Sequence, residues 1–341
     1  GPTALALYSL LKCGVDPKDP VIERGFDWLR SFHRITAEWD GNDAGGKVRH
    51  WTHTIAGGSY ELSAMILALT AKYDPRKKTS RTRSARSKGR LKVKDPMDRI
   101  WMQQLVNALV ARRGQPLETM FELDRSTIER MANPKKEKGP PEPDEDQLPP
   151  KKERLGWRYN MPSINLVHGT KTSRDGMGRG VGIPPHANQD LSSTQLAALA
   201  LFAAQQFKMK IPPEVWIDIA HFTLSCQEED GPDHKRHDPV LSGDGYAVPT
   251  DKARGFMYIK GSPDGSEGVA TGSMTACGIA NLLMAKEASV MTKKGRKLWT
   301  KSNLDSEVHK AIWDGIAWLD RNWSPFRNTN SRYGYPIYYL Y

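Results

Sequence analysis

The chain has 341 residues, of which 38% are hydrophobic and 26% charged, a composition typical of a globular protein with a buried core. No apolar run approaches the roughly 20 residues that a membrane-spanning helix needs, so we expect no transmembrane segment. The three cysteines, Cys13, Cys226 and Cys277, share no short spacing, which argues against a disulfide framework or a cysteine-rich zinc site.

Four segments that begin with a hydroxyl residue are apolar nearly all round, which is typical of buried helices. They start at Thr3, Ser63, Thr194 and Thr275. Each is followed along the chain by a segment with apolar residues at helical spacing and charges between them, which predicts an amphipathic outer helix. These second segments start at Pro20, Pro96, Pro213 and Ser306.

The alternation of inner and outer helices predicts an all-α fold of four helix pairs, in which each pair covers the apolar face of its neighbour. We expect a single repeat domain over residues 1–341, interrupted by a basic insertion at 74–94 and a Pro- and charge-rich one at 134–154. Gly and Pro predict loops over 168–189 and most of 228–270, and Leu117 to Met131 predicts an extra surface helix.

The basic insertion holds most of the net charge of +11. Residues 76–94 contain ten Lys and Arg and no acid, so the other 322 residues together carry a net charge of +1. The segment either stays solvated or binds an anionic partner such as RNA or anionic lipid. It lacks interleaved aromatic residues, so base stacking is not supported. The predicted anion contacts are Arg81, Arg83, Arg86, Lys88 and Arg90.

Short phrases before two of the inner helices resemble those of a known family. Gly156-Trp-Arg-Tyr159 and Gly255-Phe-Met-Tyr258 resemble the G-x-W and G-W-x-Y turns of bacterial prenyltransferase and squalene-oxidase repeat proteins. The stretches from Asp190 to Leu201 and from Gly272 to Gly278 are similar to two further phrases of that family. The resemblance covers the helix pairs and leaves the insertions outside it. It implies the α/α toroid of squalene–hopene cyclases and protein prenyltransferases, with long loop insertions.

The resemblance also bears on catalysis. In squalene–hopene cyclases an inner helix begins with D-x-D-D-T, and the middle Asp protonates an alkene. The matching stretch here is Asp190-Leu-Ser-Ser-Thr194, with Ser192 and Ser193 in place of the two acids. A serine hydroxyl is too weak an acid for that step. Asp190 is therefore the one candidate catalytic acid, but we expect it to cap the helix, and its second alternative is a role in a ligand pocket.

No zinc or other cofactor is expected. Protein prenyltransferases hold zinc partly through a D-x-C pair, and no D-x-C occurs in the chain. Two H-x-x-H pairs, His50/His53 and His234/His237, could bind a divalent metal, but solvated loops explain them better.

Residues around the start of the third inner helix are the candidates for a ligand cavity. Aromatic rings and hydroxyl groups there could line a pocket for an isoprenoid-like molecule. The candidates are Trp157, Tyr159, Ser192, Ser193, Thr194 and Gln195.

The sequence therefore predicts a terpene-cyclase-like toroid that is not an enzyme and binds a hydrophobic isoprenoid-like ligand or a protein partner. The alternative is an isoprenoid-converting isomerase with a degenerate acid motif. Binding to an anionic partner through residues 76–94 would be an accessory role.

Overall fold

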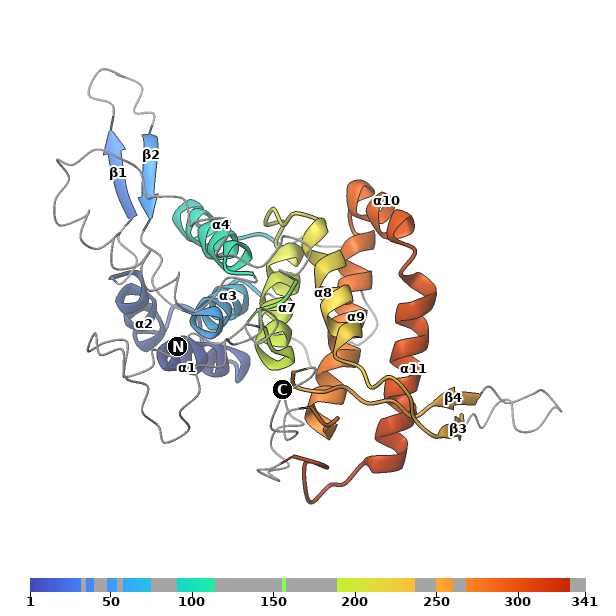
Figure 1. The fold of residues 1–341 in the computed structure, drawn as a ribbon. Helices are drawn as coiled ribbons and strands as arrows, with labels where there is room; N and C mark the ends of the chain where they lie inside the picture. The colour runs from blue at the N-terminus through green and yellow to red at the C-terminus, as the bar shows by residue number, and fades with distance from the viewer. Residues whose placement is uncertain are drawn as a thin grey trace, which may run out of the picture. The chain divides into compact units, whose positions relative to one another are not determined.

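The computed structural model describes residues 1–31, 35–39, 48–53, 58–74, 91–113, 155–157, 189–236, 250–259 and 268–331. Over these residues the protein is mostly helical, with nine α-helices and four short strands (Figure 1), so the predicted all-α character is confirmed. The insertion 134–154, the helix expected at 117–131 and residues 75–90 of the basic insertion lie outside the described residues.

The chain divides into two compact units. The first contains residues 1–150, 159–182 and 203–211, and the second contains residues 151–158, 183–202 and 212–341.

The first unit is built around a helix that is buried along most of its length. Its elements are α1 (Pro2–Lys12), α2 (Pro20–Ser31), β1 (Ile35–Trp39), β2 (Val48–His53), α3 (Ser59–Lys72) and α4 (Pro96–Ala111). Every residue of α3 from Leu62 to Ala71 is buried, because α3 packs against both α1 and α4. The prediction of a buried helix over this segment is thus confirmed.

Two local signals fix where helices of this unit begin. Asp95 caps α4 by accepting a hydrogen bond from the amide of Met97 at 2.7 Å, and Pro96 follows at the first helical position. At α3 the carboxylate of Glu61 accepts a hydrogen bond from the amide of Gly58 at 2.9 Å. The strands β1 and β2, which the sequence analysis did not predict, pair antiparallel with Ile35 opposite His53.

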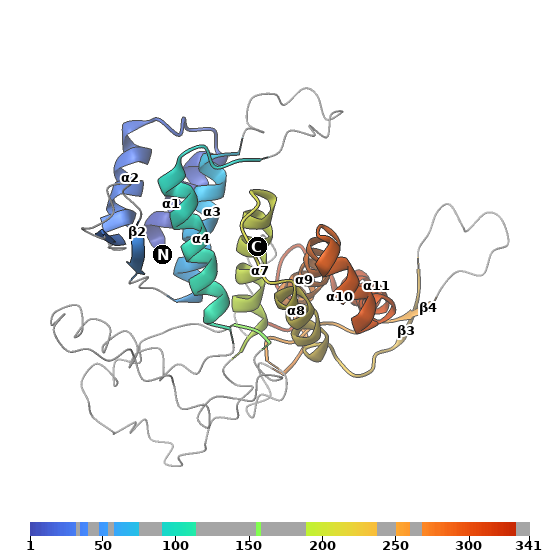
Figure 2. The ribbon, with the colours of Figure 1, turned by 90° about the horizontal axis from the view of Figure 1, so that it is seen from above.

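The second unit is a layer of helices with a small hairpin at one side (Figures 1 and 2). Its elements are most of α7 (Leu191–Gln206), α8 (Glu214–Ser225), β3 (Asp233–Lys235), β4 (Thr250–Lys252), α9 (Gly272–Val290), α10 (Lys293–Ser302) and α11 (Asp305–Asn322). Helix α9 packs against α8, α10 and α11, and β4 packs against α11. The strands β3 and β4 take up six of the described residues of 228–270, and the other described residues there form no helix or strand, in agreement with the prediction of loop over most of this range.

Two of the hydroxyl residues that marked the predicted inner helices, Thr194 and Thr275, lie inside the first turn of their helix rather than at the cap. Helix α7 begins at Leu191, three residues before Thr194, and α9 begins at Gly272, three residues before Thr275. The cap positions belong to Asp190 and Thr271. The hydroxyl groups of Thr194 and Thr275 therefore accept hydrogen bonds from the segments that precede their helices.

Candidate functional site

The turn before α7 gathers most of the predicted site residues. Asp190 is fully buried at the cap position of α7. Its Oδ1 accepts a hydrogen bond from the Ser193 amide at 2.6 Å, and its Oδ2 accepts one from the Ser193 hydroxyl at 2.8 Å. Both carboxylate oxygens thus hold the first turn of the helix, which is the geometry of an N-cap.

The phrase at 155–157 is hydrogen-bonded to the same turn. The amide of Asp190 donates to the carbonyl of Trp157 at 2.8 Å, and the amide of Trp157 donates to Oγ1 of Thr194 at 3.0 Å. The amides of Leu155 and Gly156 both donate to Oε1 of Gln189. A Cβ on Gly156 would collide with the Phe222 ring and with Oγ1 of Thr194, so the close approach requires glycine.

The same arrangement recurs before α9. The amide of Phe256 donates to Oγ1 of Thr275 at 3.0 Å, and the amide of Thr271 donates to the carbonyl of Phe256 at 3.2 Å. Thr271 caps α9, with Oγ1 accepting from the Met274 amide at 3.2 Å. A Cβ on Gly255 would meet Oγ1 of Thr275, as one on Gly156 would meet Oγ1 of Thr194.

In each of these turns, a third backbone hydrogen bond connects the start of the helix to a segment further along the chain. The first helical amide of α7, from Leu191, donates to the carbonyl of Tyr258 at 3.0 Å. The first helical amide of α9, from Gly272, donates to the carbonyl of Thr329 at 3.2 Å. The two turns are therefore copies of one structural element, in which Thr271 occupies the place of Asp190.

The predicted ligand-cavity residues fall mostly within this element. The structure brings Trp157, Ser193 and Thr194 together with Asp190, and protein atoms cover all four completely. Gln195 is also buried, with 6% of its surface exposed, whereas Ser192 is partly exposed. Tyr159 lies outside the described residues, as do Arg81, Arg83, Arg86, Lys88 and Arg90.

The histidines and cysteines were candidates for metal or thiol chemistry. Over the residues that the structure describes, no cluster of three or more His, Cys, Asp or Glu side chains could hold a metal ion. His234 Nε2 lies 2.9 Å from Oδ2 of Asp320 on α11, and His237 falls outside the described ranges. Burial raises the pKa of the Cys277 thiol to about 12, so it stays protonated at neutral pH. Within the described ranges, no helix is long and apolar enough to cross a bilayer.

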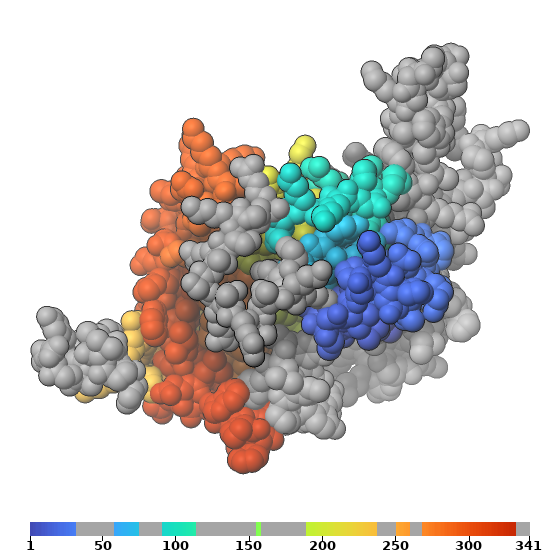
Figure 3. Space-filling view, turned by 180° about the vertical axis from the view of Figure 1, so that it is seen from behind, coloured from blue at the N-terminus to red at the C-terminus, as the bar shows by residue number. Residues whose placement is uncertain are grey.

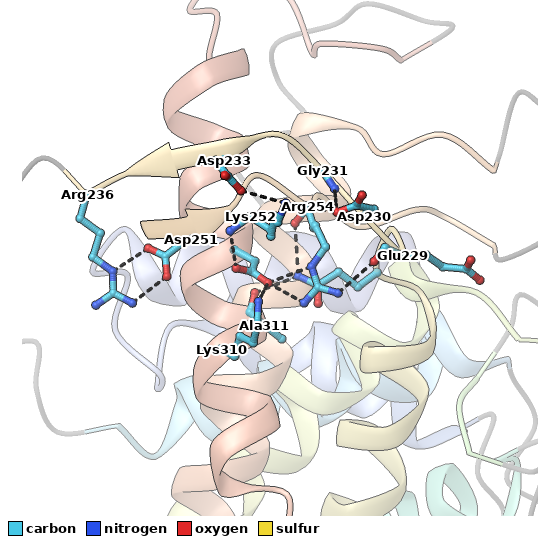
Figure 4. A network of polar contacts seen from close by, with 12 residues as sticks. Glu229, Asp230, Gly231, Asp233, Arg236, Asp251, Lys252, Arg254, Lys310 and Ala311 are labelled. Carbon is cyan, nitrogen blue, oxygen red and sulfur yellow. Dashed lines mark hydrogen bonds and ion pairs between the residues drawn. The ribbon is translucent and has the colours of Figure 1, made fainter. Parts of the chain in front are cut away.

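A polar network that the sequence analysis missed fastens the β3–β4 hairpin to α11 (Figure 4). The fully buried Asp314 on α11 accepts hydrogen bonds from the Arg254 guanidinium, from the Lys310 ammonium at 2.7 Å and from the Lys252 amide at 2.9 Å. Arg236 pairs with both carboxylate oxygens of Asp251, at 2.6 and 2.8 Å. A buried carboxylate needs such partners to offset its lost hydration, so the network is structural.

The first unit has its own buried carboxylate. Asp98 on α4 accepts hydrogen bonds from Arg30 at 2.5 Å, from Lys72 at 2.7 Å and from the Tyr73 hydroxyl at 2.5 Å. Burial alone would raise the pKa of Asp98, but the bonds from Lys72, Tyr73 and Arg30 lower it below its ordinary value. Burial and the bond to Asp98 raise the pKa of Tyr73. The carboxylate therefore ties α2 and the end of α3 to α4.

The helix α10 was also missed by the sequence analysis, and it is strongly basic. It carries five cationic side chains and no acid over ten residues, with every cation exposed: Lys293, Lys294, Arg296, Lys297 and Lys301. The sequence contains a sign of this helix, because its lysines recur every four residues and Trp299 lies on the opposite side of a helix from them. The segment has too few apolar residues to show the periodicity that marks an amphipathic helix.

Comparison with known proteins identifies no relative: no family model, curated protein or solved structure matches the chain.

Proposed function

We propose that the protein is a non-catalytic helical-repeat binding module of the terpene-cyclase-like kind, with its helix pairs arranged as an α/α toroid. The observation that carries the proposal is the equivalence of Asp190 and Thr271. Asp190 and Thr271 occupy the same position in two copies of one turn, and both accept a hydrogen bond from an amide of the helix. Because threonine can fill this position, we infer that it requires a hydrogen-bond acceptor and not an acid.

The surroundings of Asp190 support the same conclusion. A general acid must present its proton to the substrate. Both oxygens of Asp190 instead accept hydrogen bonds from Ser193, and the residue is fully covered by protein. The neighbouring hydroxyl of Thr194 is likewise engaged, by the Trp157 amide.

The partner in this proposal is a protein or a hydrophobic isoprenoid-like ligand. Apolar side chains left exposed on the second unit favour a protein. Leu283 on α9 is 51% exposed, Ile316 on α11 is 39% exposed, and Trp323 at the end of α11 is 56% exposed. Tryptophan is among the residues that contribute most to the binding energy of protein interfaces.

The test is incubation of the purified protein with squalene and with shorter isoprenoids, followed by product analysis. We expect no cyclised product. Cyclised product from the wild-type protein that disappears in the Asp190→Asn variant would overturn the proposal and would favour the alternative, an isoprenoid-converting enzyme.

A further inference from the structure

Apart from Lys301 in the last turn, the cations of α10 are arranged in a way that does not stabilise the helix. Lys293 and Lys294 occupy its first two positions, where the helix dipole favours acids, and the first turn contains no acid. Lys293, Lys297 and Lys301 follow at intervals of four residues, so like charges neighbour one another along one face. Both features disfavour an isolated helix, which suggests that the charges are kept for a partner.

The lysine row faces directly away from the body of the unit. Successive helical residues turn by about 100°, which places Lys293, Lys297 and Lys301 opposite the buried Gly295 and Trp299. Trp299 anchors the helix, with its Nε1 donating to Oδ1 of Asp305 at 3.2 Å. The row therefore lies at the surface, on a helix that is anchored to the body of its unit. The atoms of α9 and α10 are orange at the upper left of Figure 3.

The charges of this row have no acidic partner in the part of the chain that the structure describes. Among the described residues, Lys294 pairs with Glu214 at 3.1 Å, whereas none of the lysines of the row forms an ion pair with another described residue. The five cations of α10 and the ten of residues 76–94 together exceed the net charge of +11, so the rest of the chain is net acidic. The positive charge of α10 is thus a local feature.

We infer that the exposed face of α10 binds the phosphate backbone of a nucleic-acid duplex without reading its bases. Lysines four residues apart are separated by about 6 Å along the helix axis, so the row spans about 12 Å. One strand of a duplex presents a phosphate every 3.4 Å or so of axis, and several phosphates therefore lie within reach of the row. The face has no exposed aromatic ring to stack on a base.

An anionic membrane fits this face less well. Helices that lie on membranes insert an apolar side between the lipids while their lysines contact the headgroups. The apolar side of α10, with Gly295 and Trp299, is buried against its own unit, so only charge is available to a partner.

The experiment measures binding of the full 341-residue chain to a fluorescent 16-base-pair duplex of arbitrary sequence, over a series of salt concentrations. The triple variant Lys293→Glu, Lys297→Glu, Lys301→Glu is compared with a control of equal charge change, Lys18→Glu, Lys210→Glu, Lys235→Glu, at exposed lysines elsewhere. Anionic phospholipid vesicles and polyglutamate serve as competing probes.

We expect the α10 variant to bind the duplex at least tenfold more weakly at 100 mM salt. The slope of log Kd against log salt should fall by about 2.7, since each phosphate contact contributes about 0.9. The scattered control should change the affinity less than threefold. The α10 variant should melt close to wild type, because the gain from glutamate at position 293 in the first turn offsets the loss from glutamate at position 301 in the last turn.

Several results would overturn the inference. Equal losses in the two variants would mean that net charge alone matters, and no loss in the α10 variant would remove the helix from the interface. Loss of vesicle binding with unchanged duplex binding would assign the face to membranes. Competition by polyglutamate as effective as that by the duplex would indicate a generic polyanion site. If the charge reversal unfolds the protein, the same three lysines changed to Gln give the same test with half the charge change.

Discussion

The repeated turn predicts that Thr194 and Thr275 each contribute one indispensable hydrogen-bond acceptor. In Thr275→Val the shape of the buried side chain is kept, but the Phe256 amide loses the Oγ1 that it donates to at 3.0 Å. The Thr271 carbonyl keeps the helix bond from the Thr275 amide at 2.9 Å, so only one buried group is left unsatisfied. Such a group costs about 1–3 kcal/mol, and we expect a loss of about 2 kcal/mol.

The same reasoning applies to Thr194→Val, which deprives the Trp157 amide of its acceptor, and the two variants should lose similar amounts. The free energies of unfolding come from urea denaturation. The matched control is Thr70→Val in α3, a buried threonine whose hydroxyl only donates to the Leu67 carbonyl at 2.8 Å. The control should lose less than about 1 kcal/mol, because no donor is left without an acceptor. Losses at Thr194 and Thr275 no larger than that of the control would refute the reasoning.

Three further predictions concern other parts of the structure. Asp98→Asn should lower the free energy of unfolding by about 3 kcal/mol at pH 7, because it breaks a buried ion-pair network. Since the folded state lowers the pKa of Asp98, this contribution is complete above the unfolded-state pKa of about 3.9 and is lost as the pH falls through the lowered value. The difference between the variant and wild type should therefore shrink in urea titrations below pH 4, and a constant difference would contradict the assignment. Gly278→Ala should cost about 1–3 kcal/mol in the same assay, because its Cβ would collide with the Phe256 ring, and an unchanged midpoint would contradict this packing. An alkylating reagent at pH 8 should modify the exposed Cys13 much faster than Cys277, whose pKa burial raises to about 12, and equal rates by mass spectrometry would contradict the burial.

The positions of eight of the nine described helices were predictable from the sequence, although α1, expected to be buried all round, exposes Leu5 and Leu10. The apolar run after Ser63 could only be a buried helix, and α3 is buried along most of its length. The amphipathic segments at Pro20 and Pro96 became α2 and α4, because proline at a first helical position is a strong local signal.

The features that were missed depend on distant partners. The bond between Trp157 and Thr194 spans 37 residues, and the one between Phe256 and Thr275 spans 19, so local patterns reveal neither. The strands β3 and β4 are three residues each and owe their position to contacts with α11. The sequence did identify the motifs that begin at Gly156 and Gly255. It did not show that a threonine in the following helix accepts a hydrogen bond from each motif.

The measurement that tests the central claim most directly compares Asp190→Thr with Asp190→Ala. The claim is that Asp190 serves as a helix cap equivalent to Thr271. Threonine keeps an acceptor oxygen for the Ser193 amide, whereas alanine removes it, and loss of a cap costs about 0.5–2 kcal/mol. The account predicts that Asp190→Thr stays within about 0.5 kcal/mol of wild type in urea denaturation while Asp190→Ala loses at least 1 kcal/mol. Equal destabilisation by the two substitutions would contradict it.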